Sequence, residues 1–156
     1  MCGLGTAGSL SLLKTRPEKP FFVMNGDILT NINLEHLLNY HLLNKADATI
    51  AVREINYEIP YGVIQHEDKK IVQIKEKPAQ NLFINAGIYL IDPSCLVHLP
   101  PDKYVDMPDF LNSLIKSEMN IISFPIREYW LDIGKMDDFD KAQSDYNSFF
   151  NTTNGI

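Results

Sequence analysis

Blocks of apolar residues alternate with polar stretches along the chain, and their spacing predicts strands and helices in turn. Continuous apolar runs predict buried strands at Phe21 to Asn25 and Ala48 to Val52. Between them, apolar positions recur at helical spacing after Asn33, a residue type that commonly caps helices. His41 falls on the apolar side of this helix. We therefore expect His41 to face the core.

The remaining blocks predict a hairpin, further strands and three more helices. A helix from Ser9 to Thr15 is expected, with Thr6 as its cap and Pro17 at its end. Residues Gly62 to His66 and Ile71 to Lys75 flank a charged turn, which is typical of a hairpin. The other predicted elements are a strand at Asn85 to Ile91, a helix at Phe110 to Ser117 with a cap at Asp106, a strand at Ile121 to Pro125 and a helix at Asp137 to Asn147.

This order of elements predicts an α/β fold. We expect a mostly parallel open sheet with helices on both faces and an antiparallel insertion near Gly62 to Lys75. A length of 156 residues and a hydrophobic content of 45% suit one globular domain. We assign residues 1–150 to this domain and residues 151–156 to a flexible polar tail.

The charge balance narrows the range of partners. Fourteen basic and 20 acidic residues give a net charge of -6, which argues against nucleic acid or an anionic membrane as a partner. The cysteines, Cys2 and Cys95, lack the spacing of metal ligands. No secretory signal and no apolar run of 18 residues are found, so a cytoplasmic protein with free thiols is expected.

Two aspartates follow apolar segments that are far apart in the sequence. Asp27 closes the segment Asn25-Gly26-Asp27, and Asp132 lies within Trp130-Leu131-Asp132-Ile133-Gly134. Ligands of open α/β sheets bind at the carboxyl ends of the strands, so these carboxylates are candidates for holding a divalent cation that carries phosphates. In the structural alternative, each aspartate only caps a turn.

Six short motifs resemble those of the sugar-phosphate nucleotidylyltransferases, also called nucleoside-diphosphate-sugar pyrophosphorylases. They occur in the family's order and are Leu4-Gly5-Thr6-Ala7-Gly8, Asn25-Gly26-Asp27, Tyr61-Gly62-Val63-Ile64, Glu76-Lys77-Pro78, Asn85-Ala86-Gly87-Ile88-Tyr89 and Trp130-Leu131-Asp132-Ile133-Gly134. The family opens with a Gly-rich phosphate loop containing Gly-Thr-Arg and with a Lys-Pro element, neither of which precedes these motifs here. The chain thus resembles an N-terminally truncated member of the nucleotide-diphospho-sugar transferase fold, which is Rossmann-like.

The resemblance implies an enzyme that joins a nucleoside triphosphate to a sugar 1-phosphate and releases pyrophosphate. By this resemblance, Asp27 and Asp132 bind Mg²⁺ and, with Lys77, form the catalytic set. Mg²⁺ screens the repulsion between two anionic reactants and holds them in line. Without the phosphate loop, we expect the isolated chain to have little or no turnover.

The same resemblance assigns the substrate contacts. Lys77 contacts the sugar phosphate, and Glu76 accepts hydrogen bonds from sugar hydroxyls, together with Gly62 and Asn85 in one pocket. A solvated charge run and a turn are the structural alternatives for Glu76-Lys77 and for Gly62. The nucleotide contacts are Gly5, Thr6, Ala7 and Asp27, and for the first three the alternative is a simple helix start.

Two rival functions stay open at this point. A sugar-nucleotide-dependent glycosyltransferase needs an Asp-x-Asp element, and Asp138-Phe139-Asp140 matches it literally but lies in a helical pattern. A non-catalytic remnant that binds sugar phosphate is the other rival.

The motif at residues 85–89 leans toward guanylyl and mannose substrates. In the family fold the missing strands lie beside Phe21 to Asn25, so a homodimer or an upstream segment is expected to cover that edge.

Overall fold

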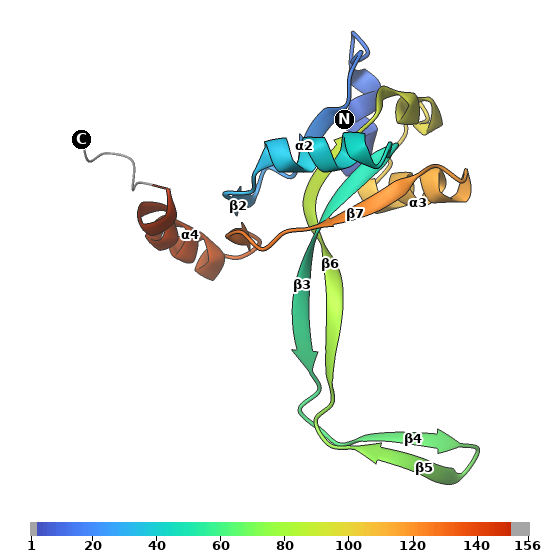
Figure 1. The fold of residues 1–156 in the computed structure, drawn as a ribbon, viewed down its shortest axis with the longest axis vertical. Helices are drawn as coiled ribbons and strands as arrows, with labels where there is room; N and C mark the ends of the chain where they lie inside the picture. The colour runs from blue at the N-terminus through green and yellow to red at the C-terminus, as the bar shows by residue number, and fades with distance from the viewer. Residues whose placement is uncertain (1–2, 151–156) are drawn as a thin grey trace.

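The computed structural model describes residues 3–150, which form a body built on a four-stranded sheet and a long arm that projects from it (Figure 1). The strand order is β1-β6-β3-β7. β6 is antiparallel to both of its neighbours, whereas β3 and β7 are parallel. β1, β3 and β7 therefore share one direction and β6 opposes them, so the sheet is mixed and two of its three pairings are antiparallel. The predicted α/β fold is confirmed, whereas the sheet is less parallel than predicted, because β6 is inserted between β1 and β3. The strands are β1 (Phe21–Met24), β3 (Ala48–Glu58), β6 (Ala79–Ile91) and β7 (Ile121–Pro125).

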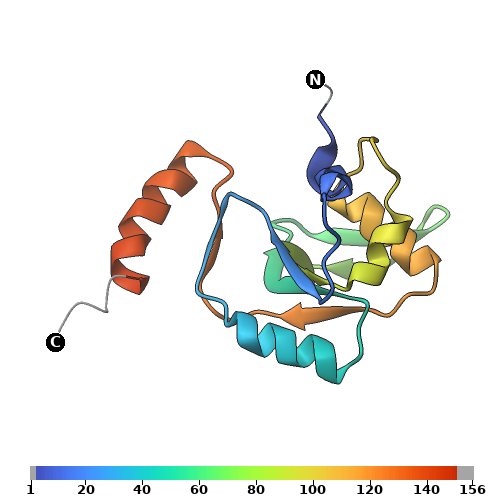
Figure 2. The same ribbon diagram turned by 90° about the horizontal axis from the view of Figure 1, so that it is seen from above.

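Helices cover both faces of this sheet, as predicted. Successive side chains of a strand point to opposite faces, so β6 supplies Ile88 to one core and Ile91 to the other. Leu37 of α2 (Leu34–Leu43) packs in the first core, and Phe110 of α3 (Met107–Lys116) packs in the second. Figure 2 shows α2 and α3 on opposite sides of the strands.

The start and the buried face of α2 follow the sequence pattern. The Asn33 side chain accepts a hydrogen bond from the His36 backbone N–H at 3.0 Å, which satisfies a free donor of the first turn. His41 is 2% exposed and its Nδ1 lies 2.9 Å from the Thr49 hydroxyl of β3. Burial lowers the pKa of His41, although Asp92 and Asp47 partly oppose this shift. The predicted cap and core-facing histidine are confirmed.

The first helical segment differs from the prediction. It consists of α1 (Gly5–Gly8) and the 3-10 helix η1 (Ser9–Leu12), so it begins and ends earlier than Ser9 to Thr15. Thr6 lies inside α1 and does not cap it; its hydroxyl accepts from the Met107 backbone N–H of α3 at 2.8 Å. The prediction used only local sequence, whereas a segment about 100 residues away sets this helix.

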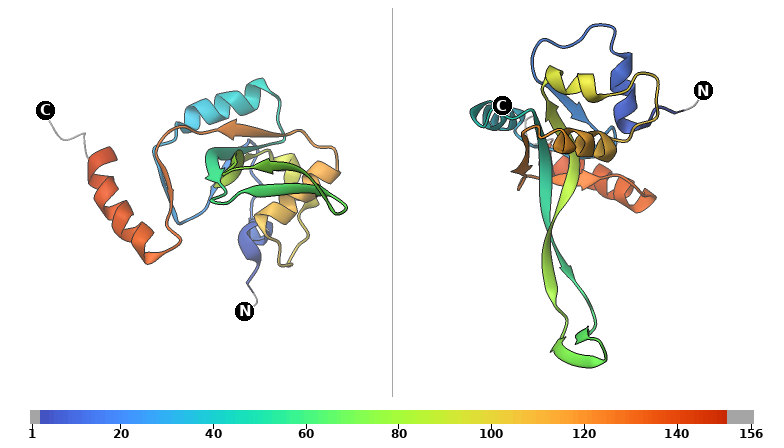
Figure 3. Two further views of the ribbon diagram at one scale, coloured as in Figure 1. Left: turned by 90° about the horizontal axis from the view of Figure 1, so that it is seen from below. Right: turned by 90° about the vertical axis from the view of Figure 1, so that its right-hand side faces the viewer.

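Four elements complete the body. A two-stranded antiparallel ribbon pairs β2 with β8, and the helix α4 follows it. The bounds are β2 (Ile28–Thr30), β8 (Trp130–Asp132) and α4 (Met136–Phe149), with a further 3-10 helix, η2 (Pro93–His98), between β6 and α3. In Figure 3, α4 stands apart from the main sheet.

The arm is formed where β3 and β6 continue beyond the sheet. Their antiparallel pairing runs on from Val52 opposite Asn85 to Glu58 opposite Ala79. At the tip lies the predicted hairpin, β4 (Val63–Glu67) paired with β5 (Lys70–Lys75). β3 and β6 are longer than predicted. The sequence did not indicate the added residues because their side chains are mostly exposed and carry little apolar pattern. The right view of Figure 3 shows the arm as a twisted ribbon.

Several expectations concern the ends of the chain and its compartment. The predicted tail at residues 151–156 and Cys2 lie outside the described residues. Cys95 is a free, buried thiol, and burial raises its pKa to about 12. Within residues 3–150, no helix combines the length and the apolar character needed to cross a bilayer.

Candidate functional site

A cavity of about 380 Å³ opens where strand β6, the β2–β8 ribbon and the start of α3 meet. Its lining combines carboxylates and amides with apolar atoms from segments that are far apart in the sequence. The polar side chains in this lining are Thr6, Asn25, Asn85, Tyr89, Asp106 and Asp132. This mixture suits a polar ligand that needs both donors and acceptors.

A bulge in β6 shapes one wall of the cavity. The pairing register with β3 shifts between Ile50 opposite Tyr89 and Val52 opposite Asn85, and within this interval Gly87 has a φ of +70°. The Asn85 side chain braces the bulge, since Oδ1 accepts from Gly87 N–H at 2.9 Å and Nδ2 donates to the Tyr89 hydroxyl at 2.9 Å. Asn85 therefore faces the cavity in a braced position and keeps one amide hydrogen and one lone pair free.

Gly87 is required at this bulge for two reasons. Its positive φ is a conformation that L side chains rarely adopt. In addition, a Cβ at this position would lie 2.8 Å from Nδ2 of Asn25, a residue that also lines the cavity. Burial raises the pKa of Tyr89, while its hydrogen bond from Asn85 opposes the shift. This wall is thus a close-packed part of the fold.

Trp130 connects the β2–β8 ribbon to the same bulge. Its indole N–H donates to the Ala86 carbonyl at 2.9 Å, and its ring packs at the edge of the core that contains Leu37. The tryptophan therefore belongs to the core, as its residue type suggests. This bond fixes β8, and with it Asp132, beside the cavity.

Asp27 and Asp132 lie on adjoining segments of this ribbon. Asp132 is opposite Ile28 in the β2–β8 ladder, and the Ile133 N–H donates to the Asp27 carbonyl at 2.8 Å. Asp132 lines the cavity, whereas Asp27 lines an adjoining hollow; Thr6 and Asn25 border both. Two aspartates that are about 100 residues apart in the sequence are thus brought to one side of the fold.

The donor set at this place fits Mg²⁺. Both carboxylates are exposed, and among residues 3–150 no cluster of three or more histidine, cysteine, aspartate or glutamate residues could hold a metal by itself. Mg²⁺ usually keeps several waters and is held by one or two carboxylates together with substrate phosphates. A pair of exposed carboxylates beside a polar cavity suits binding of this kind.

Of the four residues predicted to contact the nucleotide, one reaches this cavity, and Asp27 lines the adjoining hollow. Thr6 lines the cavity, while Ala7 is fully buried. Gly5 has a φ of +75°, and a Cβ there would lie 2.5 Å from the Val105 carbonyl oxygen. Gly5 and Ala7 therefore hold α1 against the segment before α3, and Thr6 presents its side chain to the open space.

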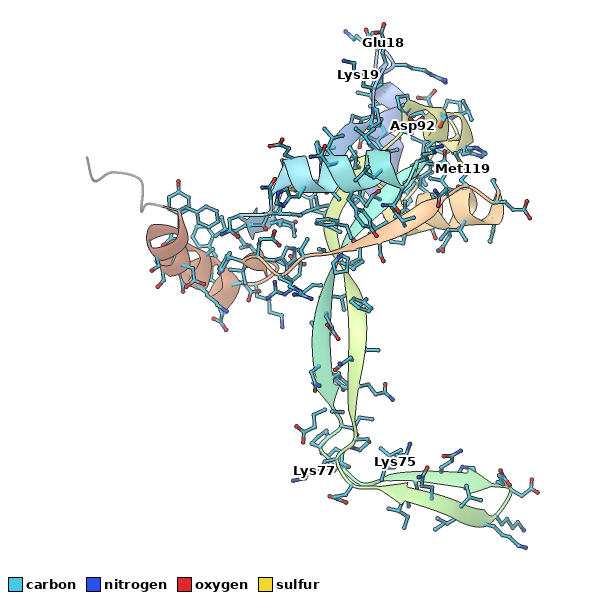
Figure 4. All side chains as sticks on the ribbon, viewed as in Figure 1. Glu18, Lys19, Lys75, Lys77, Asp92 and Met119 are labelled. Carbon is cyan, nitrogen blue, oxygen red and sulfur yellow. The ribbon has the colours of Figure 1, made fainter. Side chains whose placement is uncertain are left out.

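The predicted sugar-phosphate residues lie elsewhere, at the junction of the arm with its hairpin. Gly62 and Glu76 are neighbours, because a Cβ at Gly62 would lie 3.0 Å from the Glu76 carboxylate. Lys77 follows with a φ of +41°, a strained conformation for a residue that precedes proline. Figure 4 shows Lys77 at the bend of the arm, far from the body.

The expected single pocket containing Glu76, Lys77, Gly62 and Asn85 is therefore not formed in this structure. Asn85 lies at the base of the arm, and a continuous ladder extends from it to Ala79. At about 3.3 Å per residue, these six steps separate the two groups by about 20 Å. In this structure the paired backbone holds the arm extended, so the two groups lie apart.

Several cavity residues were not predicted as site residues. Asn25 belongs to the Asn-Gly-Asp motif, where only the aspartate was singled out. Asp106, Met107 and Pro108 were seen only as the start of a helix. Nothing local indicates that this helix start faces Asp132, so only the packing of α3 reveals these residues.

The alternative Asp-x-Asp element forms the start of a helix. Asp138 lies in the first turn of α4, and its carboxylate accepts from the Lys135 backbone N–H at 3.0 Å. Neither Asp138 nor Asp140 belongs to the lining of the cavity. The segment Asp138-Phe139-Asp140 therefore belongs to the start of a helix, as its helical sequence pattern indicated.

Comparison with known proteins identifies the family. A family model described as "Nucleotidyl transferase" matches residues 2–148. The chain belongs to the nucleotidyl transferase family. This finding confirms the resemblance seen in the six motifs. The sequence is 34% identical over 145 residues to a mannose-1-phosphate guanyltransferase of Yarrowia lipolytica, covering 87% of this chain and 39% of that protein. It is 32% identical over 151 residues to a probable mannose-1-phosphate guanylyltransferase 3 of Arabidopsis thaliana, covering 92% of this chain and 45% of that protein.

Solved structures agree with this fold. HddC from Yersinia pseudotuberculosis has a TM-score of 0.66 at 23% sequence identity, with 93% of this chain and 64% of that chain covered. A putative glucose-1-phosphate thymidylyltransferase from Bacillus anthracis has a TM-score of 0.66 at 20% identity, with 92% and 62% covered. This chain thus spans less than half the length of the two curated relatives and under two thirds of these solved chains.

Proposed function

We propose that this chain acts in the transfer of a nucleotidyl group from a nucleoside triphosphate to a sugar 1-phosphate, giving a nucleoside-diphosphate sugar and pyrophosphate. The observation that carries the proposal is the cavity shared by Asp132, Asn85 and Thr6 in a chain that matches the family model over residues 2–148. The names of the curated relatives support the same reaction class.

The chemistry requires screening of negative charge. A phosphate oxygen of the sugar 1-phosphate attacks the α-phosphorus, the bond from this phosphorus to the bridging oxygen breaks, and pyrophosphate leaves with the electron pair. Catalysis of this kind consists of positioning and electrostatic stabilisation, without a covalent enzyme intermediate. A bound Mg²⁺ supplies charge neutralisation, and Asp27 and Asp132 are the residues proposed to hold it.

Guanosine triphosphate and mannose 1-phosphate are the proposed substrates. The segment Asn85-Ala86-Gly87-Ile88-Tyr89 leans toward this branch of the family, and the two curated relatives described above carry mannose-1-phosphate guanylyl names. Within the cavity, Asn85 retains a free donor and a free acceptor for a sugar hydroxyl.

Lys77, Glu76 and Gly62 are proposed to bind the sugar phosphate when the arm approaches the body. The strained backbone of Lys77 supports a functional role, because a non-glycine residue with a φ of +41° before a proline persists only where the surrounding fold holds it. A lysine ammonium suits a phosphate, and a glutamate suits sugar hydroxyls. The alternative is a pair of solvated charges on an exposed arm.

Binding measurements test the main proposal. Calorimetry with GTP and mannose 1-phosphate, with and without Mg²⁺, should show Mg²⁺-dependent nucleotide binding that Asp132→Asn weakens. Asp140→Asn is the matched control and also tests the glycosyltransferase alternative. A loss of binding in Asp140→Asn with none in Asp132→Asn would overturn the proposal and favour that alternative.

Turnover is tested separately by pyrophosphate release. We expect the isolated chain to show little or none, because the preorganised donors of the Gly-Thr-Arg loop are not among its motifs and such donors are worth orders of magnitude in rate. Turnover in the ordinary enzyme range of roughly 1–10³ s⁻¹ would show that this chain has another triphosphate clamp. Binding of sugar phosphate with no nucleotide binding would instead favour the non-catalytic remnant.

A homodimer formed along β1 is proposed as the assembly state. β1 is an edge strand of the four-stranded sheet, and the N–H of Asn25, the residue that follows it, donates to the Gly87 carbonyl of β6. In an antiparallel ladder alternate residues face the partner, so Phe22 and Met24 turn their N–H and C=O groups to the free edge. These two residues are 38% and 51% exposed. A two-fold axis through Val23 would pair Phe22 with Met24 of a second copy, which is a self-complementary contact.

Sedimentation at micromolar concentration tests this assembly. The wild type should sediment as a dimer, and Met24→Lys should give a monomer because an edge lysine opposes strand pairing. Leu43→Lys, at an 83% exposed position of α2, is the control. A well-folded monomeric wild type would contradict the homodimer and favour an edge that another segment covers.

We also propose a cytoplasmic location for this protein, which the free thiol of Cys95 supports.

A further inference from the structure

Two segments that are about 100 residues apart form a backbone pairing beside the cavity. The amides of Ala7 and Gly8 both donate to the Val105 carbonyl at 3.0 Å, and the Val105 N–H donates to the Leu4 carbonyl at 2.9 Å. Glycine makes this approach possible, because a Cβ at Gly8 would lie 2.6 Å from the Lys103 carbonyl oxygen. The position of α1 therefore depends on the segment that leads into α3.

A side-chain exchange reinforces this pairing. Asp106 Oδ1 accepts from the Thr6 backbone N–H at 3.2 Å, and the Thr6 hydroxyl accepts from the Met107 N–H at 2.8 Å. Asp106 occupies the N-cap position of α3, but its side chain makes no capping bond to that helix. Thr6 instead satisfies one of the free N–H groups of α3. Asp106 thus supplies an acceptor to α1, which contains Thr6, and Thr6 supplies an acceptor to α3, which begins beside Asp106.

The second oxygen of the Asp106 carboxylate is also engaged. Asp106 Oδ2 accepts from the Tyr104 hydroxyl at 2.9 Å, and this bond with the nearby negative charge raises the pKa of Tyr104. Both oxygens of Asp106 therefore have protein donors, which fixes the orientation of the carboxylate. Thr6 and Asp106 line the same cavity as Asp132 and Asn85.

We propose that Asp106 is a positioning residue that holds Thr6 at the nucleotide end of the cavity and thereby sets the affinity for the nucleotide, without itself binding the sugar phosphate. The inference rests on the proposed nucleotidyl transfer. The physical reason is the entropic cost of ordering. If Asp106 were absent, the four-residue helix α1 would keep only the Thr6–Met107 bond and the backbone pairing, and the nucleotide would have to order that looser segment on binding.

The sign of the effect separates positioning from simple electrostatics. A carboxylate beside an anionic nucleotide repels it, so removal of the charge alone should strengthen binding. Loss of positioning should weaken it. Asp106→Asn keeps an oxygen acceptor for the Thr6 N–H while removing the charge, whereas Asp106→Ala removes both.

The test compares dissociation constants for GTP and for mannose 1-phosphate in the wild type, Asp106→Ala, Asp106→Asn and Asp109→Ala. Asp109 carries the same charge three residues further along α3 and serves as the control. We expect Asp106→Ala to weaken GTP binding about tenfold, as for a lost hydrogen bond to a charged group. Mannose 1-phosphate binding should be unchanged in every variant, and Asp109→Ala should bind GTP like the wild type. Asp106→Asn keeps the acceptor and loses the repulsive charge, so it should bind GTP at least as tightly as the wild type.

The outcomes distinguish this inference from the function on which it rests. Equal GTP affinity of wild type and Asp106→Ala, or equal weakening for both ligands, would overturn the positioning role and leave nucleotidyl transfer intact. Tighter GTP binding by Asp106→Ala would show that the carboxylate acts only as a repulsive charge. A wild type that binds neither ligand would overturn the proposed function and this inference together. Thermal unfolding of each variant verifies that the fold is retained.

Discussion

The body and the arm of this molecule are built from the same two strands but are stabilised differently. In the body, the inner parts of β3 and β6 are buried between α2 and α3, and Ala48, Ala86 and Ile91 are fully buried. In the arm, the outer parts of the same strands have no helix over them, and most of their side chains are exposed. The difference shows that one continuous ladder serves both as a core element and as a solvent-exposed ribbon.

This division also separates the predicted site residues. Asp27, Asp132, Asn85 and Thr6 lie in the body, where packing holds their backbones. Gly62, Glu76 and Lys77 lie on the arm, where mainly strand pairing and turn geometry hold them. A site that used both groups would combine a preformed half with a half that must move.

The largest expected effect is a difference in the free energy of unfolding between alanine variants of two phenylalanines. Phe110 is 1% exposed in the body and Phe83 is 63% exposed on the arm. Phe110→Ala should lower the free energy of unfolding by about 3–5 kcal/mol, because it leaves a cavity in the core. Phe83→Ala should change it by no more than ~0.5 kcal/mol. Urea denaturation measures both, and similar losses would show that the arm is packed in solution.

The junction between the two regions gives the next largest effect. Gly87→Ala should destabilise the protein by about 1–3 kcal/mol, because alanine at a φ of +70° is strained and its Cβ meets the Asn25 side chain. Gly26→Ala is the control, since a Cβ there meets nothing within 4 Å. Equal stability of the two variants, measured by urea denaturation, would contradict the assigned bulge geometry.

Lys77→Ala sharpens the functional side of the comparison. We expect about tenfold weaker binding of mannose 1-phosphate, because a hydrogen bond to a charged group is lost, and a smaller dependence of that binding on salt. Titrations at two ionic strengths measure both quantities. Lys75→Ala, on the neighbouring strand β5, is the control. Equal affinities for wild type and Lys77→Ala would show that Lys77 is only a surface charge.

The smallest expected effect concerns pH and the body alone. Burial lowers the pKa of His41 in the folded protein, so the unfolded chain binds a proton more readily. The stability contributed by neutral His41 is complete above pH 6.5, the ordinary value, and is lost as pH falls below it toward the lowered folded pKa. His41→Gln should flatten this decline between pH 7 and pH 5 in denaturation experiments. His66→Gln, on the arm, is the control, and an unchanged decline in His41→Gln would contradict the assignment.

Local patterns were sufficient wherever a segment buries one face. The spacing of apolar residues after Asn33 predicted α2 and its core-facing His41, because a helix covering a sheet must place its apolar side chains at helical intervals. The hairpin of β4 and β5 was predicted from a different signal, a charged turn between two strand-like runs, although the side chains of both strands are mostly exposed. The motif order alone indicated the family that the comparisons support.

The sequence by itself thus determined most of the elements and their order, the α/β class and the two strand-associated aspartates, whereas the antiparallel position of β6 emerged only in the tertiary structure. Only the tertiary structure decided that Asp132 shares a cavity with Asn85 and Asp106, and that Lys77 lies about 20 Å away along the arm. The physical reason is that periodicity reports which side of an element is buried, not which distant element covers it. Thr6 shows this directly, since its hydroxyl binds the start of a helix about 100 residues further along the chain.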